Sequence, residues 1–210
     1  MKLFKTLFTI LFISLLSSPS WSATIDDLVK REGIYYQKFT DVPFSGKVNG
    51  KEQGSFKNGV KEGFWVEYFE NGQLMFKGNY KNGSLDGPWV MYHENGQLQL
   101  KGNYKNGELD GPWVEYWDDG QLETKGNYKS GKQEGVWVEY WDNGQLRTKG
   151  NWKSDNKEGL QVSYWKNGQL YIEGNWNGGK KEGSWVTYNK DGTLYKLFTG
   201  MFKNDVKISD

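Results

Sequence analysis

From Gly63 to Gly183 the chain repeats one pattern of glycine and aromatic residues every 24 residues, without an insertion or a deletion. A fixed period of this length is typical of repeat proteins, in which each unit is one small supersecondary element and adjacent units bury their apolar surface against each other. No part of the pattern resembles a reaction centre, so we expect a binding or scaffolding rod rather than an enzyme. The phase is carried by Gly63, Gly87, Gly111, Gly135, Gly159 and Gly183, and by Tyr68, Tyr92, Tyr116, Tyr140, Tyr164 and Tyr188.

Each unit contains the signals of one β-hairpin and one connection. In the unit that starts at Gly111, two runs of alternating β-favouring residues flank Asp119-Gly120, and Asp-Gly or Asn-Gly between such runs is a strong hairpin signal. A second break, such as Asn82-Gly83, follows each returning strand. Because an isolated hairpin is marginally stable in water, the units must stack side by side. The sequence predicts an all-β fold, an elongated single twisted antiparallel sheet of tandem 24-residue β-hairpins.

The hairpin register decides which side chains share a face. A two-residue Asn71-Gly72 turn would place Trp65 opposite Gly78 and Phe69 opposite Leu74, and would gather the Trp, Leu, Gly and Tyr positions on one face. A three-residue turn with a glycine bulge would gather the Val, Tyr and Leu positions instead, because a slip of one residue reverses every side chain of one strand. We favour the two-residue turn, since a large ring fits well over a glycine.

The segments outside the array have their own signals. Residues 1–22 read as a secretory signal, with basic residues, an apolar run from Leu7 to Leu16, and small residues at the cleavage positions before Ala23. We therefore expect an exported protein, periplasmic or secreted. The apolar run is too short for a good membrane span and no later segment is a candidate, so we expect no transmembrane span in the mature chain. With no cysteine, the chain forms neither disulfides nor a lipidated cysteine.

The predicted domain organisation has four parts: the signal peptide at 1–22, an N-terminal cap at 23–43, the repeat array at 44–205 and a C-terminal tail at 206–210. Within the cap, Ile25 to Glu32 is expected to form a short helix, before a capping strand that begins at Ile34-Tyr35-Tyr36.

The fifth unit departs from the pattern. Gln161 stands where other units have tryptophan, and Asp155-Asn156 replaces the glycine turn. We expect a bend or a weak joint there.

Charge and composition exclude several classes of partner. Two of the 27 basic residues and none of the 26 acidic residues lie in residues 1–22, so the remaining chain has a formal net charge of about −1. Nucleic-acid binding would require clustered Lys and Arg, whereas here nearly every Lys has an acidic neighbour. The 17% of aromatic residues argues against disorder despite the low mean hydropathy. We expect no nucleic-acid partner, and a core built from rings.

The repeat motif resembles the bacterial variant of the MORN repeat over roughly residues 44–205. The motif reads Gly-x-Trp-x-x-Tyr-x-x-Asn-Gly-x-Leu-x-x-x-Gly-x-Tyr-x-Asn-Gly, and the opening Asp41-Val42-Pro43-Phe44-Ser45-Gly46-Lys47-Val48 is similar to the start of proteins in that family. The resemblance implies protein scaffolding or membrane association. Many of these proteins are labelled antitoxins of toxin–antitoxin systems, which implies, as an alternative, a neutralising partner of a toxin.

Catalytic and metal sites are not expected. With one histidine, His93, and no cysteine, neither a usual zinc site nor a Cys-His pair can form. Paired carboxylates such as Glu115 and Glu139 recur one repeat apart, but stacked repeats supply such spacing without catalysis. Asp118-Asp119-Gly120 lacks the remaining oxygen ligands of a calcium loop. We expect no cofactor and no enzymatic activity.

The functional candidate is a row of aromatic residues at one repeat position. One interpretation is that this row and a second tryptophan row are both core. The other is that one row is partly open and presents rings to a sugar chain, a peptide strand or a protein. Our leading hypothesis is a protein-interaction scaffold at the cell envelope, and the alternatives are a glycan or cell-wall binder and a membrane-surface module. The candidate binding ladder consists of Phe69, His93, Trp117, Trp141 and Trp165, and the second row of Trp65, Trp89, Trp113, Trp137 and Trp185.

Overall fold

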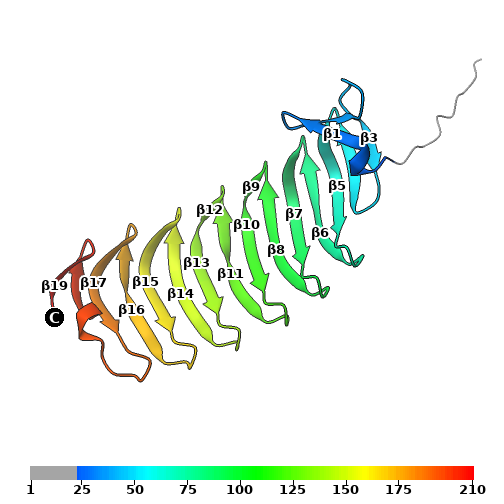
Figure 1. Ribbon diagram of the computed structural model, residues 1–210. Coiled ribbons are helices and arrows are strands. Elements are labelled where there is room, and N and C mark those ends of the chain that lie inside the picture. The colour runs from blue at the N-terminus through cyan, green and yellow to red at the C-terminus, as the bar shows by residue number, and fades with distance from the viewer. Residues whose placement is uncertain (1–22) are drawn as a thin grey trace, which may run out of the picture.

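The computed structural model describes residues 23–210, and the expected signal peptide at 1–22 lies outside them. A 17-stranded antiparallel sheet runs along an elongated body (Figure 1), and β1 and β2 form a separate two-stranded sheet. The predicted all-β fold, a single long antiparallel sheet of tandem hairpins, is confirmed. The elements are η1 (Ile25–Asp27), β1 (Leu28–Arg31), β2 (Ile34–Gln37), β3 (Gly46–Val48), β4 (Glu52–Lys57), β5 (Val60–Tyr68), β6 (Leu74–Lys81), β7 (Ser84–Tyr92), β8 (Leu98–Lys105), β9 (Glu108–Leu109), β10 (Gly111–Tyr116), β11 (Leu122–Lys129), β12 (Lys132–Gln133), β13 (Gly135–Tyr140), β14 (Leu146–Lys153), β15 (Asn156–Tyr164), β16 (Leu170–Asn177), β17 (Lys180–Thr187), η2 (Lys196–Phe198), β18 (Gly200–Lys203) and β19 (Val206–Ser209).

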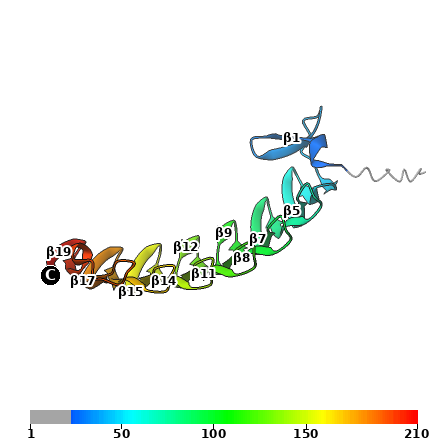
Figure 2. The same cartoon turned by 60° about the horizontal axis from the view of Figure 1, so that its bottom comes forward.

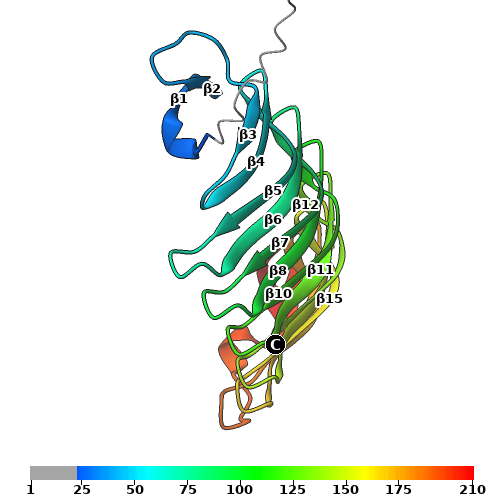
Figure 3. The same cartoon turned by 90° about the vertical axis from the view of Figure 1, so that its right-hand side faces the viewer.

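The strands follow one another through the sheet in chain order. β9 and β10 both pair with β8, and β12 and β13 both pair with β11, so each pair of short strands is one interrupted strand. β3 and β19 therefore lie at opposite ends of the row (Figure 1). Figure 2 shows that the row is curved, and Figure 3 shows that the strands bow into a shallow trough with β1, β2 and η2 on its hollow side.

The two kinds of turn have different geometry. Asn82 and Gly83 have φ of 50° and 82° and join β6 to β7 as a two-residue turn, which matches the positive φ that such hairpins require. At the other end of the strands, the Phe69 N–H donates to the Gln73 carbonyl at 2.8 Å and closes a three-residue loop in which Gly72 has φ 82°. Both predicted breaks are turns, but the two-residue turn lies at the connection rather than at Asn71-Gly72.

The register agrees with one half of the expected pairing. Trp65 lies opposite Gly78, as expected for the two-residue turn. The predicted pairing of Phe69 with Leu74 is wrong, because Tyr68 lies opposite Leu74 instead. The longer loop adds one residue, and the residue after Leu74 is left unpaired as a β-bulge that restores the register. The loop of one alternative thus coexists with the Trp–Gly pairing of the other, and Leu74, which was expected on the face of Trp65, lies on the face of Tyr68 instead.

One face of the sheet, which we call the ring face, has a core of aromatic rings over glycines. A Cβ added at Gly54 would lie 2.3 Å from Trp65 Cδ2, so the indole rests directly on the glycine backbone. The Trp65 ring then meets Phe56 edge-on, with centroids 5.0 Å apart. The expected fit of ring over glycine is confirmed, but the covered glycine belongs to the preceding strand and not to the hairpin partner. The contacts are Trp65 on Gly54, Trp89 on Gly78, Trp113 on Gly102, Trp137 on Gly126 and Trp185 on Gly174.

The N-terminal cap covers the first strands of the ring face. The predicted helix from Ile25 to Glu32 is wrong: one 3-10 turn, Ile25–Asp27, precedes β1, because pairing with β2 extends the following residues. The predicted capping strand is confirmed as β2. Ala23 forms a parallel bridge with Val48. The bridge occupies the outer edge of β3. The buried cluster between the cap and the sheet consists of Leu28 from the cap and Val48, Phe56, Trp65 and Phe76 from the sheet.

The C-terminal end and the fifth unit differ from expectation. Residues 206–210, predicted as a tail, contain strand β19, which pairs with β18. β15 pairs with β14 through a two-residue register shift and with β16 through a one-residue shift, as the equivalent strands β5 and β7 do with their neighbours, so the fifth unit does not interrupt the sheet. The turn is formed by Ser154 and Asp155, with φ of 50° and 67°, and not by the predicted Asp155-Asn156, because Asn156 already pairs with Lys153; glycine is therefore not needed there. Gln161 lies over Gly150 in place of a ring, and its buried Oε1 has no hydrogen-bond partner among the described residues.

Candidate binding face

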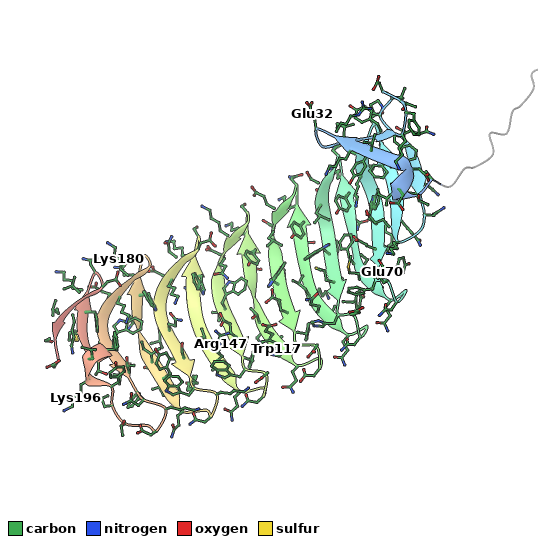
Figure 4. The ribbon with its side chains drawn as sticks, viewed as in Figure 1. Glu32, Glu70, Trp117, Arg147, Lys180 and Lys196 are labelled. Carbon is green, nitrogen blue, oxygen red and sulfur yellow. The ribbon has the colours of Figure 1, made fainter. Side chains whose placement is uncertain are left out.

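The predicted ladder lies along the hairpin ends of the strands. Each ladder residue is the last one before the three-residue loop, with its N–H donating to a Gln carbonyl four residues later at 2.8 Å. Trp117 and Arg147 lie near this edge in the middle of the row (Figure 4). The two aromatic rows differ in burial: four of the five core-row tryptophans are buried and Trp89 is partly buried, whereas all five ladder residues are partly buried. The ladder is therefore neither fully core nor fully open.

The polar edges of three ladder rings bond to the next repeat. Trp141 Nε1 donates to the Tyr164 carbonyl, and Trp165 Nε1 to the Tyr188 carbonyl, both at 3.1 Å. His93 Nε2 lies 2.8 Å from the carbonyl oxygen of Tyr116. These bonds fix the ring orientations and hold neighbouring hairpin ends together. His93, the single histidine, has the same structural role, because its ring takes the place of the indole in other units.

Trp117 is the exception in this row. Its Nε1 is buried and has no hydrogen-bond partner among the described residues. The hairpin ends also carry a row of asparagines whose amides donate to a carbonyl of the next loop, and at this unit Asp119 replaces asparagine and has no N–H to donate. The hairpin ends of the third and fourth units therefore lack both bonds. The asparagine bonds are Asn71 to Glu94 (3.1 Å), Asn95 to Asp118 (2.6 Å), Asn143 to Lys166 (2.8 Å) and Asn167 to Lys190 (3.2 Å).

A row of carboxylates holds the opposite edge together, and sequence reasoning missed it. Each carboxylate accepts a hydrogen bond from a backbone N–H in the next connecting turn along the chain, 20 residues further on, or 22 for Asn204. The bond satisfies a donor that the sheet leaves unpaired. The signal was present, since an acidic residue precedes every phase glycine. The bonds are Asn82 N to Glu62 (2.7 Å), Asn106 N to Asp86 (3.3 Å), Ser130 N to Asp110 (3.3 Å), Ser154 N to Glu134 (3.0 Å), Gly178 N to Glu158 (2.9 Å) and Asn204 N to Glu182 (3.2 Å).

Carboxylates accompany the rings in the middle of the ladder. The Arg147 guanidinium carbon lies 4.9 Å from the Trp141 ring centroid, and its Nη1 is 3.7 Å from a Glu139 oxygen. Burial raises the pKa of the Glu123 carboxyl, and the negative charge of Glu115 raises it further. This part of the ring face thus combines indole surface with desolvated negative charge.

Lysines line the ring face in its C-terminal half. Lys157 Nζ lies 4.7 Å from the Trp176 ring centroid, and Lys181 Nζ lies 4.6 Å from that of Trp185. Burial lowers the pKa of both ammonium groups, because desolvation disfavours the charged form. The charge along the face therefore changes from acidic in the middle to basic near the C-terminal end.

Residues 23–210 contain neither a metal ligand cluster nor a membrane-spanning helix. No three His, Asp or Glu side chains come together there as a metal ligand set, and no helix there has the length and apolar character needed to cross a membrane.

The fold and the two rows of cross-repeat bonds define a tandem β-hairpin repeat protein. The MORN repeat variant family matches five consecutive segments, which together cover just over half of the chain: 61–82, 85–106, 109–130, 133–154 and 157–177. The chain belongs to the MORN repeat variant family, as the resemblance of its motif indicated. No curated protein matches the chain.

Proposed function

We propose that this protein is an exported, non-enzymatic scaffold at the cell envelope, and that the ladder on its ring face binds a protein partner. The observation that carries the proposal is the ladder itself: five equivalent positions on one edge of the ring face hold partly buried rings in one row. Rings combine a large contact area with few rotatable bonds, which is why they are enriched at protein interfaces.

Preorganisation strengthens this assignment. The indoles of Trp141 and Trp165 are already held by bonds to the next repeat, so a partner would lose little side-chain entropy on contacting them. The carboxylates beside the ladder add polar groups that can orient a partner segment. A glycan is the second candidate, because flat rings beside carboxylates such as Glu115 also suit sugar hydroxyls.

The test is affinity capture from envelope extract with a variant that does not break the sheet. Trp117→Leu is suitable, since Trp117 Nε1 makes no bond to the next repeat and its loss leaves no carbonyl unpaired. The matched control is Leu160→Ser on the opposite face, where the side chain is 53% exposed. Circular dichroism checks that both variants fold.

The expected result is that Trp117→Leu loses a specific captured protein that Leu160→Ser and the parent chain retain. Capture of wall fragments in place of a protein, lost in the same variant, would favour the glycan. Retention of every captured species by Trp117→Leu would refute the ladder as the binding surface.

A further inference from the structure

A cavity of about 560 Å³ lies where the cap meets the first hairpin end. Here η1 forms a second wall over the ring face, and Glu70 marks the hairpin end below the cap in Figure 4. The apolar part of the lining includes Ile25, Phe69 and Met75. Phe69, the first residue of the ladder, thus lines a cavity that is open to solvent on one side, in contrast to a residue on a flat face.

The charges in this cavity do not balance. Four carboxylates line it, and two of them already have cations: Glu52 lies 2.9 Å from Lys61 Nζ, and Glu70 pairs with Lys51. Among residues 23–210, Glu67 and Asp26 accept no hydrogen bond and form no ion pair with their side chains. The cavity therefore has carboxylates without cations beside an apolar surface.

Comparison along the repeat makes Glu67 unusual. Its position recurs every 24 residues on the ring face, and every other polar side chain at that position has a partner. Glu67 alone of these has none within the described part of the chain. The partnered residues are Glu115 with Trp113 Nε1 (3.0 Å), Glu139 with Arg147 (3.7 Å), Ser163 with Thr148 (2.7 Å) and Thr187 with the Phe198 carbonyl (3.1 Å).

The surroundings of Glu67 disfavour its ionised form. Burial raises its pKa, the negative charge of Glu52 raises it further, and the positive charge of Lys61 opposes the shift. The other charged groups that line the cavity, Asp26 and the Lys51–Glu70 pair, add a net negative charge. A cation bound beside Glu67 would relieve both the desolvation and the repulsion.

We propose that this cavity binds an alkylammonium group, with the ammonium against Glu67 and the methylene stem over Phe69 and Met75. An ammonium has three donors and no acceptor, which suits a carboxylate without a partner, and its aliphatic stem packs on apolar surface. A lysine side chain of a bound peptide and a free alkyl diamine share this chemistry. The site goes beyond the proposed ladder function, because Glu67 stands at the repeat position of Glu115 and Glu139 and is not a ladder residue.

The test is calorimetric titration of the purified protein with pentylamine, cadaverine and a short capped peptide that contains one lysine. Pentanol serves as the uncharged control ligand. The matched variants are Glu67→Gln, which removes the charge and keeps the shape, and Glu115→Gln, which changes the equivalent glutamate that Trp113 already satisfies. Thermal melting establishes that both variants fold, and the amide signals of Ile25 and Phe69 in an NMR titration locate the bound amine independently of any variant.

The expected result is that the amines bind, pentanol does not, and Glu67→Gln weakens binding about tenfold, or roughly 1.4 kcal/mol, while Glu115→Gln does not. Tighter binding of the peptide than of cadaverine identifies a lysine side chain as the source, and the reverse identifies a free diamine. The proposal is overturned if no amine binds up to about 10 mM, if Glu67→Gln binds as the parent does, or if the NMR shifts fall outside the cavity. Any of these results would leave the ladder test with Trp117→Leu unaffected.

Discussion

The fit of tryptophan over glycine predicts that one methyl group will destabilise the array at Gly126. A Cβ there would lie 2.2 Å from Trp137 Cδ2 and 2.3 Å from Cε2. Trp137 is 4% exposed, so its rigid ring has no free space to move into. Gly126 is not in the left-handed region, so backbone strain does not contribute to the effect.

The same structure supplies a matched control in the next repeat. At Gly150 the nearest atom to an added Cβ is Gln161 Cγ, 3.3 Å away on a flexible side chain. Replacing glycine by alanine in a compatible strand position gains about 0.4 to 1 kcal/mol from the unfolded state, whereas overpacking costs about 1 to 3 kcal/mol. We expect Gly126→Ala to lose on the order of 2 kcal/mol, and Gly150→Ala to stay within about 0.5 kcal/mol of the parent.

Urea unfolding followed by tryptophan fluorescence measures both variants. Because repeat arrays can unfold in segments, hydrogen exchange of β11 and β13 provides a local readout beside the global midpoint. The reasoning is refuted if Gly126→Ala keeps the parent midpoint and exchange rates, or if Gly150→Ala loses as much stability as Gly126→Ala.

Three further predictions concern single side chains. Asp119→Asn should donate the missing bond to the carbonyl of Asp142 and slow hydrogen exchange at the hairpin ends of the third and fourth units, with a gain of about 0.5 to 1 kcal/mol; unchanged exchange would contradict it. Gln161→Met should remove the unpaired buried Oε1 at similar volume and raise the free energy of unfolding by about 1 kcal/mol, seen as a higher urea midpoint, and a lower midpoint would argue against this account. Glu67 binds its proton more tightly folded than unfolded, so its ionisation lowers stability as pH rises above the ordinary glutamate value of about 4.5. Glu67→Gln should therefore melt higher than the parent at neutral pH and equally at acid pH, and equal melting at both would count against the raised pKa.

Local sequence signals were sufficient for the architecture. The 24-residue period and the recurring turn pairs predicted tandem hairpins in one long sheet, because each turn depends on its own few residues. The core chemistry was also readable, since a chain with so few aliphatic residues has rings and glycines to pack. The cap was less predictable: Ile25 to Glu32 has helical character, but pairing of β1 with β2 overrides it.

The hairpin register required the tertiary structure. Side chains alternate between the two faces with a period of two, so one extra residue in the loop would reverse the faces of one strand. The bulge at Met75 adds a second extra residue and restores them. Neither feature is visible in the pattern of residues alone. The candidate ladder was found by its spacing, but its partial burial and its bonds were not. A ring such as Trp141 bonds to a carbonyl 23 residues away, across the sheet.

The repeat itself, its turns and its membership of the MORN repeat variant family are determined by the sequence, because they depend on residues close together in the chain. Which carboxylates have partners was decided only by the tertiary structure. Glu67 and Glu115 occupy the same repeat position, yet Glu115 meets an indole N–H and Glu67 faces a cavity under the cap. That difference comes from the cap, which folds over only the first units and gives one copy of a repeated residue surroundings that the other copies lack.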